Sequence, residues 1–239
     1  PSLSVNLNHY LYPKVRLNHR VVSVALVIAV GIREDGRRVI LGFATGAAET
    51  EAFWSDFLRS LVSRGLKGVQ LVISDAHEGL RQAIAKVLYG TTWQRCRVHF
   101  MRNLLAHVPQ KDKTQVAAWV RTIFAQSSLE AAQAQLSKVR DELSPKWPKA
   151  AALLEQAADD ILAFMHFPEE HWRRLASNNL LERLNREIRR RTDVVQVFPD
   201  EGSLLRLVGA LLIEVDTEWA VGHRYFSETS MQKVFKKDT

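Results

Sequence analysis

Two carboxylates stand where a metal-dependent reaction could use them. Asp75 follows the apolar run 71–73 and Ser74 in the segment LVISDAHEGL, residues 71–80. A carboxylate at the C-terminal end of a buried strand, with a helix starting just after it, occupies the place where α/β sheets bind ligands and metal ions. Asp is also a preferred helix N-cap, and these residues taken alone slightly favour that structural role for Asp75.

Glu182 is the second carboxylate, in the segment NNLLERLNREIRRRTD, residues 178–193. The segment is typical of an amphipathic helix, with an apolar stripe of Leu181, Leu184 and Ile188. Three- and four-residue spacing gathers an adjacent polar face, formed by Asn178, Glu182, Asn185, Arg186 and Arg189. A carboxylate among arginines and asparagines could ligate a divalent cation beside a phosphate backbone. The alternative is a solvated Glu182–Arg186 pair that contributes roughly 0.2–0.5 kcal/mol.

The positive charge of the chain is concentrated around Glu182. The formal net charge is +7, and residues 171–191 contain seven arginines against two glutamates. The arginines are Arg173, Arg174, Arg183, Arg186, Arg189, Arg190 and Arg191. One ion pair does not need so many arginines, so the pattern favours a patch that binds the phosphates of a nucleic acid.

The elements that must position these groups fall into an α/β core and a helical insertion. From residue 14 to about residue 96, β-branched runs alternate with helical spacing, and Asp35-Gly36 predicts a hairpin turn. From about residue 100 to 172 the spacing is helical only. We predict the first part of the core over residues 1–99, an all-helical insertion over 100–175, and the last part of the core over 176–239. Within that last part, residues 192–202 are interpreted as a loop between two helices.

Composition excludes several classes of protein. No apolar run approaches the roughly 20 residues that cross a bilayer, and the N-terminus does not resemble a signal peptide. The single cysteine, Cys96, excludes an internal disulfide framework and a multi-cysteine zinc site, and a reducing interior is expected. The first residue is Pro1 rather than Met, which favours a fragment.

Four blocks of the sequence resemble the catalytic domain of Mutator-type transposases of bacterial insertion sequences. They are VISDAHEGL, WQRCRVHFMRNLL, NNLLERLNREIRRRTDVVQVFP and LLRLVGALLIEVDTEWAVGHRYFS, in order and with plausible spacing over residues 14–235. The resemblance implies an RNase H-like mixed sheet flanked by helices and interrupted by an all-helical insertion. It also implies a catalytic triad of two aspartates and a glutamate, with Mg²⁺-dependent DNA cleavage and strand transfer. Asp75 takes the place of the second aspartate and Glu182 that of the glutamate, both as metal ligands.

The first aspartate of the family pattern is missing from this chain. It is expected shortly before Lys14-Val15-Arg16, where an ungapped reading gives His9 and one inserted residue gives Asn8. Glu34 is the first acidic residue of the chain. Two alternatives to an active transposase therefore stay open: an inactive remnant that only binds DNA or oligomerises, and an RNase H-like nuclease without strand transfer.

Several residues are expected to support this site. Cys96 and His99 form a C-x-x-H that the family also carries, and Asn178 and Asn185 flank Glu182. Core packing is the simpler role for Cys96, and zinc would need further ligands. Arg173 and Arg174, in the segment HWRR just before the Glu182 helix, are expected to contact DNA.

The resemblance also fixes the expected partners. They are DNA, as element ends and as target, and at least one further copy of the chain; Mg²⁺ is the expected cofactor, with Mn²⁺ as the alternative. No membrane and no small-molecule substrate are expected. The resemblance implies that full-length relatives recognise their element ends through an N-terminal region, and recognition of particular ends is not expected of residues 1–239. The expected location is the bacterial cytoplasm, in association with the nucleoid.

Overall fold

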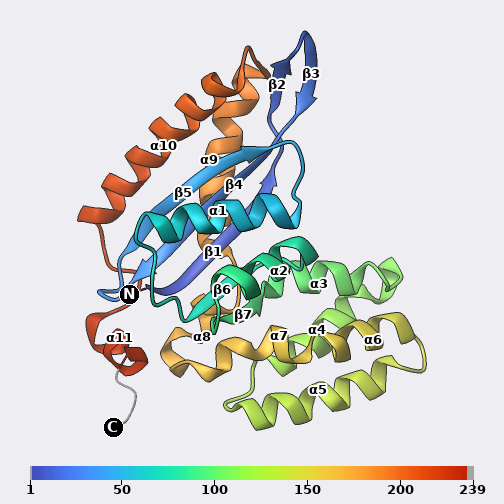
Figure 1. Cartoon of the computed structure of the whole chain (residues 1–239). Helices are drawn as coiled ribbons and strands as arrows, with labels where there is room; N and C mark the ends of the chain where they lie inside the picture. Colours follow the sequence, from blue (N-terminus) through green and yellow to red (C-terminus); the bar gives the residue numbers. More distant parts are fainter. Residues whose placement is uncertain (1, 236–239) are drawn as a thin grey trace. The chain divides into compact units, whose positions relative to one another are not determined.

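The structure is a computed structural model that describes residues 2–235, with only the backbone described at Ser2 and at residues 8–10. It divides into two compact units (Figure 1). The first contains the described residues up to Thr92 and those from Asn178 onward, and the second contains Trp93–Ser177. No helix within the described residues is long and apolar enough to span a bilayer.

A five-stranded mixed sheet forms the centre of the first unit. Its strands are β1 (Ser2–Leu11), β4 (Ala25–Arg33), β5 (Arg38–Gly46), β6 (Leu71–Ser74) and β7 (Thr92–Arg95), and the unit boundary falls within β7. The order across the sheet is β5-β4-β1-β6-β7. Strand β4 is antiparallel to both β5 and β1, whereas β1 and β6 are parallel. The expected turn at Asp35-Gly36 joins β4 to β5, and Gly36 takes the positive φ of 78° that favours glycine.

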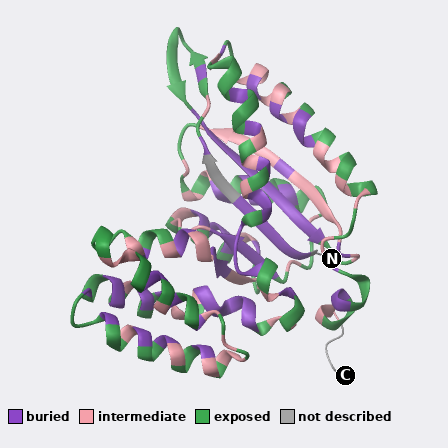
Figure 2. Ribbon diagram, turned by 180° about the vertical axis from the view of Figure 1, so that it is seen from behind, coloured by how far each residue is buried: buried purple, intermediate pink, exposed green. Residues whose placement is uncertain are grey.

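The central strand β1 was missed by the periodicity argument, which assigned no strand before Lys14. Leu3, Val5 and Leu7 alternate with Ser4 and Asn6, and all five are buried. Both faces of this strand are covered, as Figure 2 shows by its burial colouring. The apolar alternation at positions 3, 5 and 7 is a strand signal that was available in the sequence.

A second, three-stranded sheet contains β2 (Lys14–Leu17), β3 (Arg20–Ser23) and β8 (Val197–Phe198), in the order β3-β2-β8. The β-branched run over residues 20–32 is therefore two strands, β3 and β4. The prediction of a loop over residues 192–202 is wrong for most of that segment. Helix α9 continues to Val195, and strand β8 then pairs in parallel with β2. That pairing bridges residues about 180 positions apart, which local patterns do not report.

Helices cover both faces of the large sheet (Figure 1). They are α1 (Glu51–Ser63) and α2 (Glu78–Val87) on one side and α9 (Asn179–Val195) and α10 (Glu201–Val221) on the other. Strand β5 contacts helices on both faces of the sheet. Its Gly46 lies against Phe53 of α1, and its Phe43 lies against Gly209 of α10. Thr50 caps α1, and Gly65 follows its end with a positive φ of 105°. A last helix, α11 (Glu228–Phe235), follows α10.

The second unit is mostly helical. It contains α3 (Arg97–Leu105), η1 (Gln110–Asp112), α4 (Lys113–Ile123), α5 (Leu129–Leu143), α6 (Pro148–Gln156), α7 (Ala158–Leu162), η2 (Ala163–His166) and α8 (Glu169–Leu175). Trp119 and Trp147 pack together with ring centroids 6.3 Å apart. The buried Gln94 side chain donates to the carbonyl of Ile161 and accepts from the backbone N–H of Phe164, at 3.1 and 2.8 Å, which ties η2 to the start of the unit.

Candidate functional site

Asp75 lies directly after β6 and does not cap the following helix. The cap of α2 is His77, whose Nδ1 accepts a hydrogen bond from the backbone N–H of Leu80 at 3.3 Å. The Oδ1 atom of Asp75 accepts from the N–H of Ala76 at 2.8 Å. The capping role that the local sequence slightly favoured for Asp75 is therefore wrong.

Helix α9 begins beside the central strand. The side chain of Asn178, at the N-cap position, donates through Nδ2 to the backbone carbonyl of Leu7 at 3.1 Å. Farther along, Ile188 of α9 and Leu11 of β1 line one cavity. Four residues of strand and ten of helix cover similar lengths, about 13 and 15 Å. Helix and strand therefore run in the same direction.

The strand register brings Asp75 to the same level. Strands β1 and β6 are aligned with Ser4 opposite Leu71 and Asn6 opposite Ile73. Continuing this register by two residues sets position 8 beside Asp75. Position 8 directly follows Leu7, the residue that Asn178 bonds. The first turn of α9, which contains Glu182, therefore starts at this end of the sheet. The side chains of Asn8 and His9 lie outside the described residues.

Glu182 lies on the flank of α9 that is turned away from α10. The α9 residues that line the groove toward α10 include Arg183, Glu187 and Arg190 but not Glu182 or Arg189. Among the residues that the structure describes, no hydrogen bond or ion pair involves Glu182, so the alternative Glu182–Arg186 pair is not formed. The Glu182 carboxylate is half-buried and keeps its oxygens available for a ligand.

Asn185, one turn beyond Glu182, adds an oxygen to this flank. Its Oδ1 atom is buried and accepts no hydrogen bond from any described residue. A buried polar atom without a hydrogen bond costs free energy, and binding a ligand would recover that cost. Among the side chains that the structure describes, which exclude those of residues 8–10, no three His, Cys, Asp or Glu residues form a group that could hold a metal ion.

The C-terminal half of α9 has a different chemistry. Glu187 accepts hydrogen bonds from Arg190 at 2.7 Å and from Arg191 at 3.2 Å. These bonds hold the pKa of Glu187 below its usual range. Two arginines of the predicted phosphate-binding patch, Arg190 and Arg191, are thus already paired with a carboxylate.

The remaining predicted residues lie in the second unit. Cys96 and His99 are buried at the start of α3, and Arg173 and Arg174 are exposed near the end of α8. In the HWRR segment, His171 is fully buried, which leaves its two arginines as the exposed groups. Trp172 packs edge-on against Phe164 with ring centroids 5.9 Å apart, so it is part of the unit's own packing.

A groove between α9 and α10 was not found by sequence reasoning. It has a volume of about 790 Å³ and is lined by Arg183, Arg190 and Arg191 on one side and by Glu214 and Glu218 on the other. At its end the guanidinium of Arg38 lies over the ring of Trp219, 4.7 Å from the centroid. Arg38 and Trp219 are 181 residues apart, and no local pattern links them.

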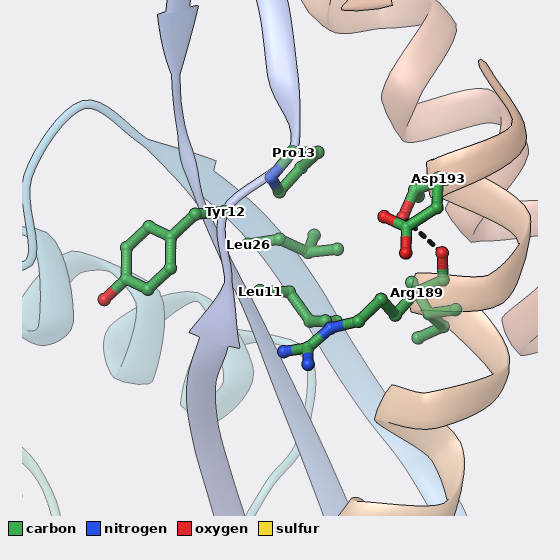
Figure 3. Close-up of a pocket in the computed structure, with 8 residues that line it drawn as sticks. Leu11, Tyr12, Pro13, Leu26, Arg189 and Asp193 are labelled. Carbon is green, nitrogen blue, oxygen red and sulfur yellow. Dashed lines mark hydrogen bonds between the residues drawn. The ribbon is translucent and has the colours of Figure 1, made fainter. Parts of the chain in front are cut away.

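A smaller cavity, which we call the side pocket, lies between α9 and the end of β1 (Figure 3). It is lined by Leu11, Tyr12, Pro13, Leu26, Ile188, Arg189, Thr192 and Asp193. Figure 3 shows the ring of Tyr12 pointing away from it. The Tyr12 hydroxyl donates to Glu49 at 2.5 Å. Partial burial, followed by that hydrogen bond and the Glu49 charge, raises the pKa of Tyr12 to about 12.

The family model and the curated relatives point to the same family. The family model for "Transposase, Mutator family" matches residues 5–222. The chain is 49% identical over 212 residues to the transposase for insertion sequence element IS1081 of Mycobacterium tuberculosis, covering 89% of this chain and 51% of that protein. It is 42% identical over 222 residues to the transposase for ISRM5 of Rhizobium meliloti, covering 93% and 56%.

A third relative is the transposase for IS256 in transposon Tn4001 of Staphylococcus aureus, 40% identical over 218 residues, covering 90% of this chain and 56% of that protein. The chain spans about half the length of these curated relatives. Among solved structures, a chain of the Drosophila P element transposase strand transfer complex is similar, with a TM-score of 0.44 and 10% identity over 90% of this chain and 77% of that one. On the family model and these relatives, the chain belongs to the Mutator family of transposases.

Proposed function

We propose that this chain is the catalytic core of a DDE-type DNA transposase, with Asp75 and Glu182 as its acidic site residues. The observation that supports this most directly is the meeting of two elements at one end of the sheet. The register of β1 and β6, continued by two residues beyond the Asn6–Ile73 pair, sets Asp75 level with position 8, and Asn178 at the start of the Glu182 helix bonds Leu7 of β1.

The wider architecture supports an RNase H-like assignment. The sheet is mixed, with β5, β4 and β1 antiparallel and β6 parallel to β1. The helical unit Trp93–Ser177 separates Asp75 from Glu182 in the chain, as an insertion between the two acidic residues would. The reaction proposed is hydrolysis that frees a 3′-hydroxyl, followed by attack of that hydroxyl on target DNA.

The donor set fits a hard divalent cation. Mg²⁺ prefers oxygen ligands and keeps several waters, so a few carboxylates hold it. Asp75 and Glu182 would supply carboxylate oxygens, and the unsatisfied Oδ1 of Asn185 offers a neutral one. Bound there, Mg²⁺ would activate the attacking oxygen and stabilise the leaving oxygen of the phosphodiester. Mn²⁺, which takes similar ligands, is the alternative.

The arginines would hold the DNA backbone beside this site. Arg183 and Arg186 are exposed and form no ion pair within the described part of the chain, so their charges are available to phosphate. Arg189 lies on the same flank as Glu182. Arg190 and Arg191 would contribute less, because Glu187 already neutralises part of their charge. Arg173 and Arg174 are proposed as contacts made by the second unit, with Cys96 and His99 supporting its local structure.

An inactive, DNA-binding remnant is the second candidate, and one observation favours it. The position level with Asp75 is Asn8, and His9 follows, so no carboxylate of β1 reaches this level. The loss of one of three carboxylates would weaken a two-cation site severely.

Restoring the carboxylate tests both candidates. Asn8→Asp and His9→Asp, each alone, would be compared with the unchanged chain on supercoiled DNA carrying the element ends, with Mg²⁺, Mn²⁺ or chelator. We expect metal-dependent nicking and joining to appear or rise in one variant and to vanish when Glu182→Gln is added. DNA binding without cleavage in every variant would identify the remnant, and cleavage without joining would identify a nuclease.

The partners and location follow from the same proposal. Handling two element ends requires at least two active sites, so a dimer or larger assembly is proposed on DNA. Light scattering of the chain with and without a pair of DNA ends would measure this directly. In the cell, the chain would act in the bacterial cytoplasm at the nucleoid.

A further inference from the structure

The hairpin of β2 and β3, residues 14–23, carries positive charge and no negative charge. We propose that this hairpin lies on the double-stranded DNA that flanks the Asp75–Glu182 site and binds its phosphates. The contacting side chains are those of Lys14, Arg16 and Arg20. This inference rests on the proposed function, because DNA must first lie at that site.

The cations of the hairpin have no anion beside them to neutralise their charge. Lys14, Arg16 and Arg20 are exposed and form no ion pair within the described part of the chain. The first acidic residue of the chain is Glu34, so none lies on either strand or on the turn between them. Such a concentration of uncompensated positive charge favours a polyanionic partner.

The strand pairing directs two of these cations to one open face. Val15, between Lys14 and Arg16, is completely buried, and it pairs with the buried Phe198 of β8. Neighbouring side chains of a strand point to opposite faces. Lys14 and Arg16 therefore lie on the face that is turned away from this packing.

The shape of the hairpin suits a groove of DNA. It extends beyond the end of the five-stranded sheet (Figure 1), and its outer strand β3 is exposed over its whole length, as the colouring of Figure 2 shows. Asn18 and His19 form a two-residue turn with positive φ values of 48° and 64°, as in the type I′ turns that match the twist of paired strands. The major groove, about 12 Å wide, admits a two-stranded ribbon of this kind.

Two separate elements place the hairpin within reach of DNA at the site. Position 8 of β1 and Lys14 are six residues apart, which spans about 20 Å of extended chain. Along α9, Glu182 and Val195 are 13 residues apart, again about 20 Å. Val197, two residues farther on, pairs with Lys14. At roughly 3.4 Å per base pair, the hairpin meets a duplex about six base pairs from the site.

A second copy of the chain is the competing partner for this exposed edge. Val21 and Val22 of the edge strand β3 are 48% and 37% exposed, and an edge strand can pair with another strand. Pairing two β3 edges would bring together two hairpins that both carry cations and no anion. Because like charges oppose such a contact, the charge of the hairpin favours DNA over a second copy.

Removing the charges should reduce the number of phosphate contacts. The probe is a duplex of about 30 base pairs and arbitrary sequence, in Ca²⁺ to prevent cleavage, and fluorescence anisotropy gives the slope of log affinity against log salt. Lys14→Gln combined with Arg16→Gln should lower this slope by about 1.8, at about 0.9 for each phosphate contact.

A matched pair of substitutions controls for the loss of charge in general. Arg33→Gln combined with Lys67→Gln also removes two exposed cations, but from the opposite end of the same sheet, where β4 ends and β6 begins. This pair should change the slope by less than about 0.4. Thermal melts establish that each variant is folded.

A photocrosslinker on the hairpin identifies its partner directly. Val21→Cys introduces a thiol on the face that carries Arg16, and the natural Cys96 is completely buried, so the label is directed to position 21. We expect this label to crosslink to the duplex, and the same label on Lys67→Cys not to do so. The crosslink carries the test if the double glutamine variant does not fold.

The outcomes separate the two proposals. An unchanged slope in the hairpin variant, an equal loss in the control pair, or a crosslink from position 21 to a second copy of the chain overturns the hairpin assignment. Each of these leaves the proposed function standing, because the duplex is still bound. Failure of the unchanged chain to bind the duplex overturns the DNA-based function, and the hairpin assignment with it.

Discussion

The two halves of helix α9 carry the same kinds of charged side chain, but these side chains form ion pairs in only one half. In the N-terminal half, Glu182 is surrounded by arginines yet forms no ion pair within the described residues. In the C-terminal half, Glu187 bonds Arg190 and Arg191. Both halves use the same apolar stripe to pack on the sheet, so packing does not explain the difference.

This contrast shows that counting arginines overestimates the positive charge available to bind DNA phosphates. Exposed ion pairs contribute little to stability, roughly 0.2–1 kcal/mol, but they do lower the charge that is available to phosphate. We propose the N-terminal half as the DNA-binding one, because Glu182, Arg183 and Arg186 form no ion pair with any residue that the structure describes. That half also starts at Asn178, where the helix is bonded to β1.

The largest expected difference is in metal-dependent chemistry. In whichever of Asn8→Asp and His9→Asp is active, Glu182→Gln or Asp75→Asn should reduce nicking by at least about 1,000-fold, because each removes an oxygen that holds the cation. Glu187→Gln, the same change five residues away, should alter the rate less than about threefold. Initial rates of plasmid nicking measure this. If Glu182→Gln and Glu187→Gln reduce the nicking rate equally, the two halves of α9 do not differ in function as proposed.

The second difference is in stability. Ile188, on the buried side of α9, is completely inaccessible to solvent, and Ile188→Ala should lower the free energy of unfolding by about 2–5 kcal/mol. Arg186→Ala, on the exposed side, should change it by less than about 0.5 kcal/mol. Urea denaturation followed by circular dichroism measures both. A small effect of Ile188→Ala would mean that α9 is not held by its apolar stripe.

Much of this helix was predictable from the sequence, because its signals are local. The stripe of Leu181, Leu184 and Ile188 is buried as predicted, and Asp35-Gly36 forms the turn. Asp75 was placed correctly at the end of a strand, although the helix cap proved to be His77. Helices, strands and turns whose signals lie within a few neighbouring residues could therefore be predicted from the sequence.

What the sequence did not reveal depends on contacts between distant residues. The hydrogen bond from Asn178 to Leu7 spans 171 positions, and the parallel register of β1 and β6 joins segments about 67 apart. Neither follows from spacing along one segment. The internal pairing of Glu187 was equally hidden, because Glu182 and Glu187 have similar neighbours in the sequence. These are the contacts on which the candidate site depends.

The third difference is in the salt dependence of DNA binding. Each phosphate contact adds about 0.9 to the slope of log affinity against log salt for duplex DNA. Arg183→Ala and Arg186→Ala should each lower the slope by about one contact, and Arg190→Ala and Arg191→Ala by less than half of that. Fluorescence anisotropy at several salt concentrations gives the slopes. Equal reductions in all four variants would show that Glu187 does not withhold its partners from DNA.

The smallest effect is the titration of Glu187 itself. Its pKa is lowered because Arg190 and Arg191 donate to its carboxylate. A lowered folded-state pKa stabilises the fold above the ordinary pKa of glutamate, and this contribution disappears as the pH falls through the folded value. NMR titration of the side chain should give a pKa below the ordinary value, and Arg190→Met combined with Arg191→Met should return it toward that value. Because the Glu187 carboxylate is exposed, the double variant should change the free energy of unfolding only slightly. The change should appear only at pH values above the lowered pKa of Glu187. An unchanged Glu187 pKa in the double variant would mean that the two halves of α9 do not differ in their internal pairing, and Glu182 would lose the comparison that distinguishes it.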